Sequence, residues 1–328
     1  METIKLGQDG AAVCPLCIGT WAWGDKLFWN YGSDEDDAKQ LQAAFQAALE
    51  AGTTFFDTAE IYGFGTSEKY LGQFMQQSDL ISSDRGSRPD RPVQIATKFG
   101  PAPWRFTAQS VSDALTESLN RLRLERVSLY QVHWSFSFFM SQETLMNALA
   151  DEVQRGRIEA VGVSNYSAEQ MQQAYKILAA RGVKLASNQV RYSLLTRQIE
   201  TNGIRDTARQ LGVTILAYSP LAQGLLTGKY TVNGDVKPTG ARRIDPRFSQ
   251  EGLQKIEPVI SILKKIGDNY GRNPAQVALN WLIAQGNVVA IAGAKNANQV
   301  QQNAGALGWQ MTDEEITQLE QVTRPWMY

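Results

Sequence analysis

Short apolar runs alternate with longer segments of helical periodicity along most of the chain. This order is typical of βαβ units that build a parallel sheet. Eight strands alternating with helices, without a clear linker, favour a closed (β/α)8 barrel of the TIM type over an open sheet. We therefore expect an α/β fold in one domain, residues 1–328, with the barrel core at about residues 13–305. The strands are predicted in the runs around Cys14 and Phe55 and at residues 93–97, 127–132, 158–163, 185–190, 213–218 and 288–293.

Additional segments are predicted at both ends of the barrel. The run IKLGQDGAAV is expected to form a β-hairpin that turns at Asp9-Gly10 and closes the N-terminal mouth. An extra helix is expected near the C-terminus. The first barrel helix is predicted to begin at Ser33, because acidic residues follow in its first turn, where the helix dipole favours negative charge, and to end at Gly52.

Two polar segments are predicted to be long loops. Residues 81–92 lead into the third strand and are expected to form a solvated loop on the face opposite the chemistry. The segment from Gly228 to Phe248 follows the seventh strand, on the face where TIM barrels build active sites, and is expected to be a flap over cofactor or substrate. Phosphate binding and simple exposure to water are equally open for its arginines, Arg242, Arg243 and Arg247.

The composition argues against several classes of partner. Lys and Arg number 32 against 33 Asp and Glu, with the two signs interspersed, so we expect no binding of nucleic acid or an anionic membrane. The chain shows no signal-peptide pattern at its start and no run of about 18 apolar residues such as a membrane span requires. We expect a cytoplasmic protein that acts on small molecules, and the sequence indicates no particular oligomeric state.

Three motifs that suggest metal or phosphate binding are given structural interpretations. Cys14 and Cys17 form a C-x-x-C pair, but strand side chains three apart point to opposite faces, and zinc would need further ligands from a chain with no other cysteine and one histidine. The run GFGTSEKYLG has Glu68 in place of a third glycine, and GLLTGKY has three residues where a Walker A loop has four. We therefore expect no metal site and no Rossmann or NTPase loop.

Polar residues follow three neighbouring strands at the points where those strands end. Asp57 ends FFD, Lys98 ends IATK, His133 ends LYQVH, and Tyr62 lies in the loop after Asp57. Each alone has a structural explanation: a helix cap, a snorkelling lysine, a core histidine or a surface aromatic. Because catalytic residues of TIM barrels gather at the carboxyl ends of the strands, the convergence of all four favours an active site.

These four side chains suit the reduction of a carbonyl group, which needs a hydride at carbon and a proton at oxygen. Tyr62 is the candidate acid. An ammonium about 4 Å away contributes on the order of 4 kcal/mol at an effective dielectric near 20, so Lys98 is expected to lower the pKa of Tyr62 from about 10 toward neutrality. Asp57 would keep Lys98 charged, and His133 would donate a hydrogen bond to the carbonyl.

The sequence also resembles the aldo-keto reductases, most closely in their plastid and cyanobacterial branch. The resemblance covers roughly residues 4–322 and implies an NADP(H)-dependent oxidoreductase that reduces aldehydes and ketones, for example in aldehyde detoxification. It places Asp57, Tyr62, Lys98 and His133 on the catalytic tetrad of the family. The blocks that carry it are FFDTAEIYGFGTSEKYLG, ATKFG, LYQVHW, VGVSNY, SNQVRYSLL, AYSPLAQGLLTGKY and IAGAKNANQVQQNAGALGW.

The resemblance further implies a set of cofactor-binding residues. Lys295 would bind the 2′-phosphate, which favours NADP over NAD, although Ala292 stands where proline is expected and Gln302 where an acidic residue is frequent. The strength of that preference therefore stays open. The implied cofactor contacts are Thr20 and Trp21, then Ser164, Asn165 and Gln189 at the carboxamide, Tyr218 stacked on the nicotinamide, Ser219, Leu221, Gln223 and Gly224 at the pyrophosphate, and Gly293, Lys295, Gln299, Gln302 and Asn303 at the adenosine end.

Aromatic residues are frequent in the loops at the carboxyl ends of the predicted strands, which form the mouth of the barrel where catalysis is expected. They suit the binding of aromatic or apolar aldehydes, or they simply pack one loop against another. We place Trp21 and Trp134 in the substrate pocket and leave open the others: Trp23, Trp29, Trp104, Phe136, Phe138 and Phe139. The physiological carbonyl substrate is not identified. Two alternatives are an aldolase with a Schiff-base lysine and an NADP-sensing subunit with little turnover.

Overall fold

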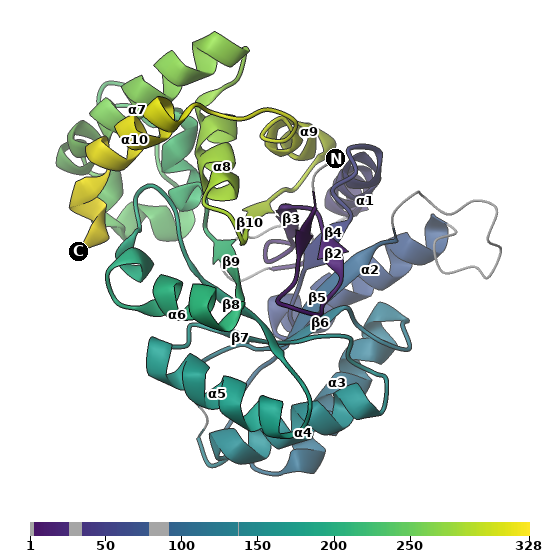
Figure 1. Ribbon diagram of the computed structural model, residues 1–328. Coiled ribbons are helices and arrows are strands. Elements are labelled where there is room, and N and C mark those ends of the chain that lie inside the picture. The colour runs from purple at the N-terminus through teal and green to yellow at the C-terminus, as the bar shows by residue number, and fades with distance from the viewer. Residues whose placement is uncertain (1–2, 26–34, 79–91, 137) are drawn as a thin grey trace.

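The computed structural model describes residues 3–25, 35–78, 92–136 and 138–328, and in them the chain closes into a barrel of eight parallel strands (Figure 1). The strand order around the barrel follows the chain, from β3 to β10. Each of the eight predicted runs overlaps one barrel strand, so the predicted (β/α)8 fold is confirmed. The strands are β3 (Leu16–Gly19), β4 (Phe55–Asp57), β5 (Gln94–Phe99), β6 (Leu129–Val132), β7 (Val161–Ser164), β8 (Leu185–Arg191), β9 (Thr214–Tyr218) and β10 (Val288–Gly293).

Helices surround this barrel, and Figure 1 shows α7 beside α10. The extra C-terminal helix predicted from the sequence is α10, which the Tyr270 hydroxyl ties to the end of α7 by donating to Glu315 at 2.8 Å. No helix in the described ranges is both long and apolar enough to span a bilayer. The helices are α1 (Glu35–Glu50), α2 (Thr66–Gln77), α3 (Ala108–Leu122), α4 (Gln142–Gln154), α5 (Ala168–Ala180), α6 (Ile204–Leu211), α7 (Gln250–Tyr270), α8 (Pro274–Ala284), α9 (Ala297–Ala304) and α10 (Asp313–Val322).

The predicted N-terminal hairpin closes the bottom of the barrel. Strands β1 (Ile4–Lys5) and β2 (Ala12–Val13) pair antiparallel. Leu6 and Val13 are fully buried and belong to the apolar cluster that fills the barrel interior. The backbone N–H of Gly7 donates to Thr214 of β9 at 2.9 Å, which fixes the hairpin to the barrel wall.

The two cysteines lie in different layers, as the strand geometry predicts. Cys17 is part of the interior cluster, whereas Cys14 packs into the larger core between strands and helices. Both cysteines are buried, and they form no disulfide bond in the described part of the chain. No group of metal-ligating side chains occurs among the residues placed by the structure.

The glycine-rich run after β4 forms a tight turn instead of a phosphate loop. Gly63, Phe64 and Gly65 have φ values of 55°, 53° and 84°, and α2 begins at the next residue. Glu68, which stands in place of a third glycine, is fully buried, accepts a hydrogen bond from Thr97 at 2.6 Å and pairs with Arg121 at 2.6 Å. This ion pair locks α2 against β5 and α3 and thereby holds the turn that carries Tyr62.

Two further sequence predictions lie partly or wholly outside the described residues. Helix α1 is described from Glu35, so its predicted start at Ser33 is not among them, whereas Gly52 follows the helix with φ of 71° as expected. The predicted loop at 81–92 and Trp29 also lie outside the described residues, except for Pro92.

Candidate active site

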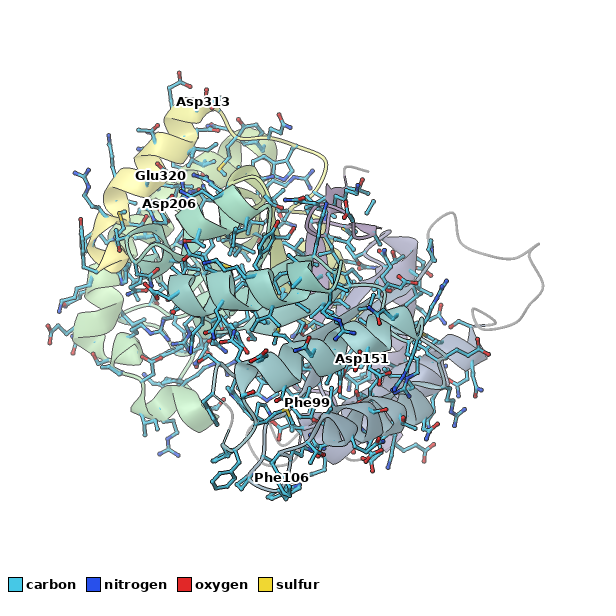
Figure 2. The ribbon with its side chains drawn as sticks, turned by 60° about the horizontal axis from the view of Figure 1, so that its bottom comes forward. Phe99, Phe106, Asp151, Asp206, Asp313 and Glu320 are labelled. Carbon is cyan, nitrogen blue, oxygen red and sulfur yellow. The ribbon has the colours of Figure 1, made fainter. Side chains whose placement is uncertain are left out.

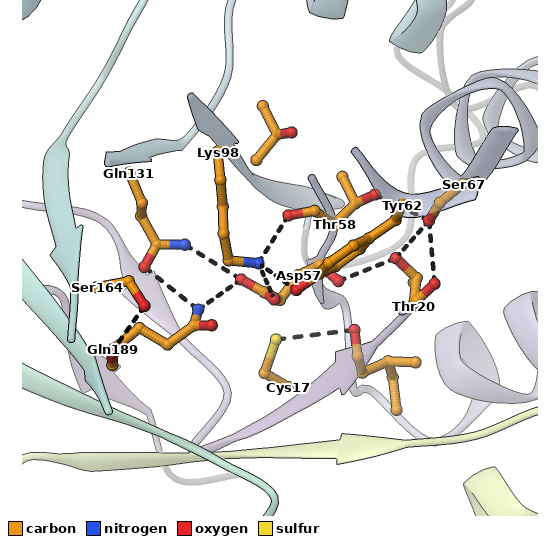
Figure 3. A network of polar contacts seen from close by, with 12 residues as sticks. Cys17, Thr20, Asp57, Thr58, Tyr62, Ser67, Lys98, Gln131, Ser164 and Gln189 are labelled. Carbon is orange, nitrogen blue, oxygen red and sulfur yellow. Dashed lines mark hydrogen bonds and ion pairs between the residues drawn. The ribbon is translucent and has the colours of Figure 1, made fainter. Parts of the chain in front are cut away.

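The Lys98 side chain lies at the centre of a hydrogen-bonded chain at the carboxyl end of the barrel (Figure 3). Strands β4 and β5 are neighbours, and Asp57 and Lys98 on them are 3% and 0% exposed. The Lys98 ammonium donates to Asp57 Oδ1 at 2.5 Å, to the Thr58 carbonyl at 2.8 Å and to the Tyr62 hydroxyl at 3.2 Å. Since an ammonium has three donors, this set satisfies the buried charge completely.

The pKa of Tyr62 departs from the sequence prediction. Burial of the hydroxyl raises it, Lys98 lowers it and Asp57 raises it again, with a net rise above its usual value. Burial lowers the pKa of Lys98, but Asp57 and Tyr62 together raise it by more, so the net shift is upward. The expected pKa near neutrality for Tyr62 is therefore wrong for the protein without ligands: that reasoning counted the ammonium and left out burial and the second charge.

His133 lies beside Tyr62 and is neutral. The two rings are 5.6 Å apart between centroids and nearly perpendicular. Burial lowers the pKa of His133 well below its usual value, and Lys98 lowers it further. Its Nδ1 is buried without a hydrogen-bond partner among the described residues, so the proton fits best on Nε2, which is then the donor.

A pair of glutamine amides lies beneath the Asp57 carboxylate. Gln131 of β6 donates to Asp57 Oδ2 at 3.1 Å, and Gln189 of β8 donates to the same oxygen at 2.8 Å. Gln189 Nε2 also lies 3.3 Å from Gln131 Oε1. Sequence reasoning missed Gln131, although a polar residue within an apolar strand, two before His133 and hence on the same face, is a usable signal.

Thr20 helps to fix the end of β4. It is fully buried, and its hydroxyl donates to the Asp57 carbonyl at 2.9 Å and contacts Ser67 Oγ at 2.7 Å. Ser67 in turn contacts Thr58 Oγ1 at 2.9 Å. These bonds, drawn in Figure 3, fix the end of β4 against β3 and α2. The cofactor contact predicted for Thr20 stays a prediction.

The residues predicted at the nicotinamide lie on three successive strand ends. Ser164 Oγ donates to the Gln189 carbonyl at 2.9 Å and accepts from Asn165 at 3.1 Å. Asn165 adopts a left-handed backbone with φ of 59° and accepts a hydrogen bond from the Tyr218 hydroxyl at 3.1 Å. The structure thus brings Ser164, Asn165, Gln189 and Tyr218 into one connected group.

The segment after β9 forms a strained turn. Ser219, Ala222 and Gln223 have φ between 48° and 57°, and Gly224 has φ of 97°. Consecutive residues in such conformations orient backbone N–H groups toward one concave side, the arrangement that binds anions in proteins. Leu221 lies partly buried at the start of this turn. The Arg242 guanidinium donates to the Gln223 carbonyl at 2.9 Å and joins the long loop to the turn.

The three loop arginines, left open by the sequence, have different surroundings. Arg247 pairs with Asp245 at 2.6 Å, and Arg243 is exposed. The charge of Arg242 acts on Lys295, which follows β10. Burial lowers the pKa of Lys295 and Arg242 lowers it further, whereas Asp37 and Asp25 raise it by less. Of the three, Arg242 is the one whose charge acts on the predicted phosphate-binding lysine.

The remaining residues predicted at the adenosine end surround the start of α9. Gln299 accepts a hydrogen bond from the Lys295 backbone at 2.8 Å, and Asn303 donates to the Gly293 carbonyl at 3.3 Å. Gln302 is exposed and contacts Asn298 at 3.4 Å. The structure brings these residues together in one place.

The family model described as "Aldo/keto reductase family" matches residues 15–324. The chain belongs to the aldo/keto reductase family. It is therefore an oxidoreductase, and the predicted family is confirmed.

Relatives of known name agree with this membership. A chloroplastic pyridoxal reductase from Arabidopsis thaliana is 38% identical over 97% of this chain and 85% of its own length, consistent with the predicted plastid-type branch. A glycerol dehydrogenase from Gluconobacter oxydans is 28% identical with a TM-score of 0.84, over 98% of this chain and 95% of its own. An aldo/keto reductase from Klebsiella pneumoniae, solved with NADP and acetate, is 28% identical with a TM-score of 0.72, over 98% and 96%.

In this aldo/keto reductase a row of aromatic rings leads from the tetrad to the outside. His133 stacks on Trp134 with centroids 4.4 Å apart, and Trp134 stacks on Phe136 at 5.9 Å. Trp21 lies 6.4 Å from Tyr62 on the other side. Trp23, by contrast, is fully buried with its N–H bonded to Ala294, so it is a core residue.

Other aromatic side chains at the mouth are exposed. Figure 2 shows Phe106 projecting at the edge of the molecule, and it is 57% exposed. Sequence reasoning missed the ion pair that holds this loop: Glu60 after β4 accepts from Arg105 at 2.5 and 2.9 Å and from the Gly100 backbone at 2.6 Å. The pair connects the loops after β4 and β5. The exposed rings are Phe64, Trp104, Phe106, Phe136, Phe138 and Phe139.

Proposed function

We propose that the protein is an NADP(H)-dependent reductase of aldehydes and ketones, with Tyr62 as the acid. The observation that carries the proposal is the continuous chain from Asp57 through Lys98 to the Tyr62 hydroxyl, next to a neutral His133. A phenol so placed gives its proton to a carbonyl oxygen while Lys98 stabilises the phenolate that forms.

The nicotinamide cofactor would supply the hydride when bound. His133, with its proton on Nε2, donates to the carbonyl oxygen and orients it toward Tyr62. Asp57 keeps Lys98 protonated, because a buried lysine without a carboxylate tends to lose its proton. In this assignment the acid is Tyr62, the electrostatic stabiliser is Lys98, and Asp57 acts through Lys98.

Several groups of this chain fit the cofactor. The amide N–H groups of Gln189 are engaged by Asp57 and Gln131, so its Oε1 is the atom suited to accept from a carboxamide. Tyr218 would stack on the nicotinamide, and the turn containing Gln223 would bind the pyrophosphate. Lys295 and Arg242 bring two cations into one partly buried place, which favours a phosphate there and hence NADP. A structural neighbour solved with NADPH supports this choice.

The preference for NADPH provides a prediction. Lys295→Met and Arg242→Met should each lower kcat/KM with NADPH by roughly 10- to 100-fold, the loss of one charge-assisted phosphate contact, while kcat/KM with NADH changes little. Arg243→Met is the matched control, because Arg243 is exposed in the same short helix. Equal effects of Arg242→Met and Arg243→Met, or an unchanged cofactor ratio in Lys295→Met, would contradict the assignment.

The raised pKa of Tyr62 predicts the pH dependence. An acid must be protonated to act, and activity is lost as pH rises through its pKa. Since burial raises the pKa of Tyr62 above its usual value, kcat/KM for carbonyl reduction with NADPH should show no decrease between about pH 7 and about pH 9. The measurement is a pH series of initial rates. A decrease that begins between pH 7 and 9 would show that another group, or a different environment of Tyr62, controls the reaction.

The aromatic walls favour aromatic or apolar aldehydes as substrates. Trp21 and Trp134 flank the acid and His133, so they would contact the group that carries the carbonyl. The test of the proposed function is NADPH consumption by the purified protein with methylglyoxal, a nitrobenzaldehyde and pyridoxal. Turnover supports the reductase. Tight NADPH binding without consumption across the panel would contradict it and favour a sensing role.

A further inference from the structure

Gln131 is a fully buried amide in a strand whose other residues are apolar. Burying an amide costs stability unless its donors and acceptor are paired. Both the nitrogen and the oxygen of the Gln131 amide have a partner inside the barrel: Nε2 donates to Asp57 Oδ2 at 3.1 Å, and Oε1 accepts from Gln189 Nε2 at 3.3 Å. The amide is therefore built into the polar network below the tetrad.

The Asp57 carboxylate divides its two oxygens between two tasks. Oδ1 accepts from the Lys98 ammonium, and Oδ2 accepts from Gln131 and Gln189. The amides thus fix the rotation of the carboxylate that keeps Oδ1 on Lys98 at 2.5 Å. Without a donor on Oδ2, the carboxylate can turn about its Cβ–Cγ bond, and the short contact to Lys98 lengthens.

Gln131 and Gln189 differ in their access to ligands. Gln189 belongs to the group proposed to contact the nicotinamide, whereas Gln131 has no exposed surface. A ligand that hydrogen-bonds to Gln189 Oε1 can shift the Gln189 side chain relative to Asp57, but it cannot reach the Gln131 amide. Gln131 is thus the donor on Asp57 Oδ2 that persists whatever occupies the mouth.

We infer that Gln131 is a positioning residue of this reductase: through Asp57 it holds the Lys98–Tyr62 pair in the arrangement that delivers the proton. This inference rests on the proposed function. Gln131 touches neither substrate nor cofactor, and its effect passes through Asp57 alone.

The direction of the effect follows from the charges around Lys98 and Tyr62. The Asp57 carboxylate raises the pKa of both groups. Turning it away removes part of that contribution, so both groups lose their protons at lower pH. The alkaline decrease in kcat should then begin at a lower pH than in the wild-type protein. The titratable groups that face this pair are Cys17 from β3, Asp57 from β4, His133 after β6 and Tyr218 from β9.

The test compares Gln131→Met, which keeps the length of the side chain and removes the donor, with Gln94→Met. Gln94 is the matched control, because it is also a buried glutamine of the barrel, 9% exposed. It lies at the start of β5, at the opposite end of that strand from Lys98, and donates to the Ala12 carbonyl of the N-terminal hairpin. Gln131→Met should lower kcat by roughly 10- to 100-fold, the effect of a small misplacement of a catalytic group, with NADPH affinity within about threefold of wild type. Gln94→Met should retain wild-type kcat and pH dependence.

A second measurement does not depend on turnover. Titration of the Tyr62 Cζ resonance in protein labelled with ¹³C-tyrosine, assigned with Tyr62→Phe, reports the ionisation of the phenol directly. A downward move of this titration in Gln131→Met, absent in Gln94→Met, supports the inference. The inference would be overturned if both variants lost Tm and kcat equally and the Tyr62 titration did not change. Gln131 would then be a core residue only. Inactive wild-type protein would refute the proposed function alone, because the titration still decides the role of Gln131.

Discussion

Tyr62→Phe should lower carbonyl reduction by roughly 100- to 10,000-fold while NADPH affinity stays within about threefold. The substitution removes the phenol O–H, which is the proposed proton donor, and the Lys98 contact at 3.2 Å. It keeps the ring and therefore its packing against Trp21 and His133. Steady-state rates with NADPH and fluorescence titration of the cofactor give the two quantities.

Tyr218→Phe is the matched control for that variant. It also removes one phenol O–H at the mouth, but that hydroxyl bonds to Asn165 and not to Lys98. We expect a change in KM for the cofactor with kcat altered by less than about tenfold. Wild-type turnover in Tyr62→Phe, or an equal loss of kcat in both variants, would refute Tyr62 as the acid.

Lys98→Met should have the largest effect on stability. It leaves the Asp57 carboxylate buried without its counter-charge, and breaking a buried ion pair in this way typically costs about 3–5 kcal/mol of unfolding free energy. Turnover should fall with it, because the stabilisation of the Tyr62 phenolate is lost. Urea denaturation followed by circular dichroism measures the unfolding free energy.

Two further variants separate charge from packing in that experiment. Asp57→Asn combined with Lys98→Met removes both charges and should recover most of the lost stability without recovering turnover. Lys255→Met removes one partner of the exposed pair with Glu251 and should change stability little. If the Lys98→Met protein were as stable as wild type, the Asp57 carboxylate would not be buried and dependent on Lys98 as the structure indicates.

The fold was predictable because the βα alternation leaves a periodic pattern in every unit, and the eight strands lie where the apolar runs predict. The convergence of Asp57, Tyr62, Lys98 and His133 was predictable for a similar reason, since parallel strands bring their carboxyl ends to one face. In the structure Lys98 bonds to both Asp57 and Tyr62, and His133 lies against Tyr62, as the predicted arrangement requires. The catalytic roles stay a proposal.

The properties that depend on three-dimensional surroundings were less accessible. The pKa of Tyr62 is decided by burial of its hydroxyl and by Asp57, and neither contribution can be weighed from chain order. Thr20 precedes a predicted pocket residue, yet its side chain points into the protein. Arg242 and Arg243 are adjacent in sequence, and only the path of the loop shows which of them meets Lys295.

The N-terminal hairpin, which closes the bottom of the barrel, bears on how the proposed acid Tyr62 regains its proton between turnovers. Below Asp57 an apolar cluster occupies the described barrel interior down to Leu6 and Val13, and apolar side chains conduct no protons. In the proposed mechanism, the proton that Tyr62 gives away is therefore expected to return from the carboxyl end of the barrel, where the alcohol product leaves. Reprotonation of the proposed acid would then wait for product release, so slow product release would also delay the next turnover.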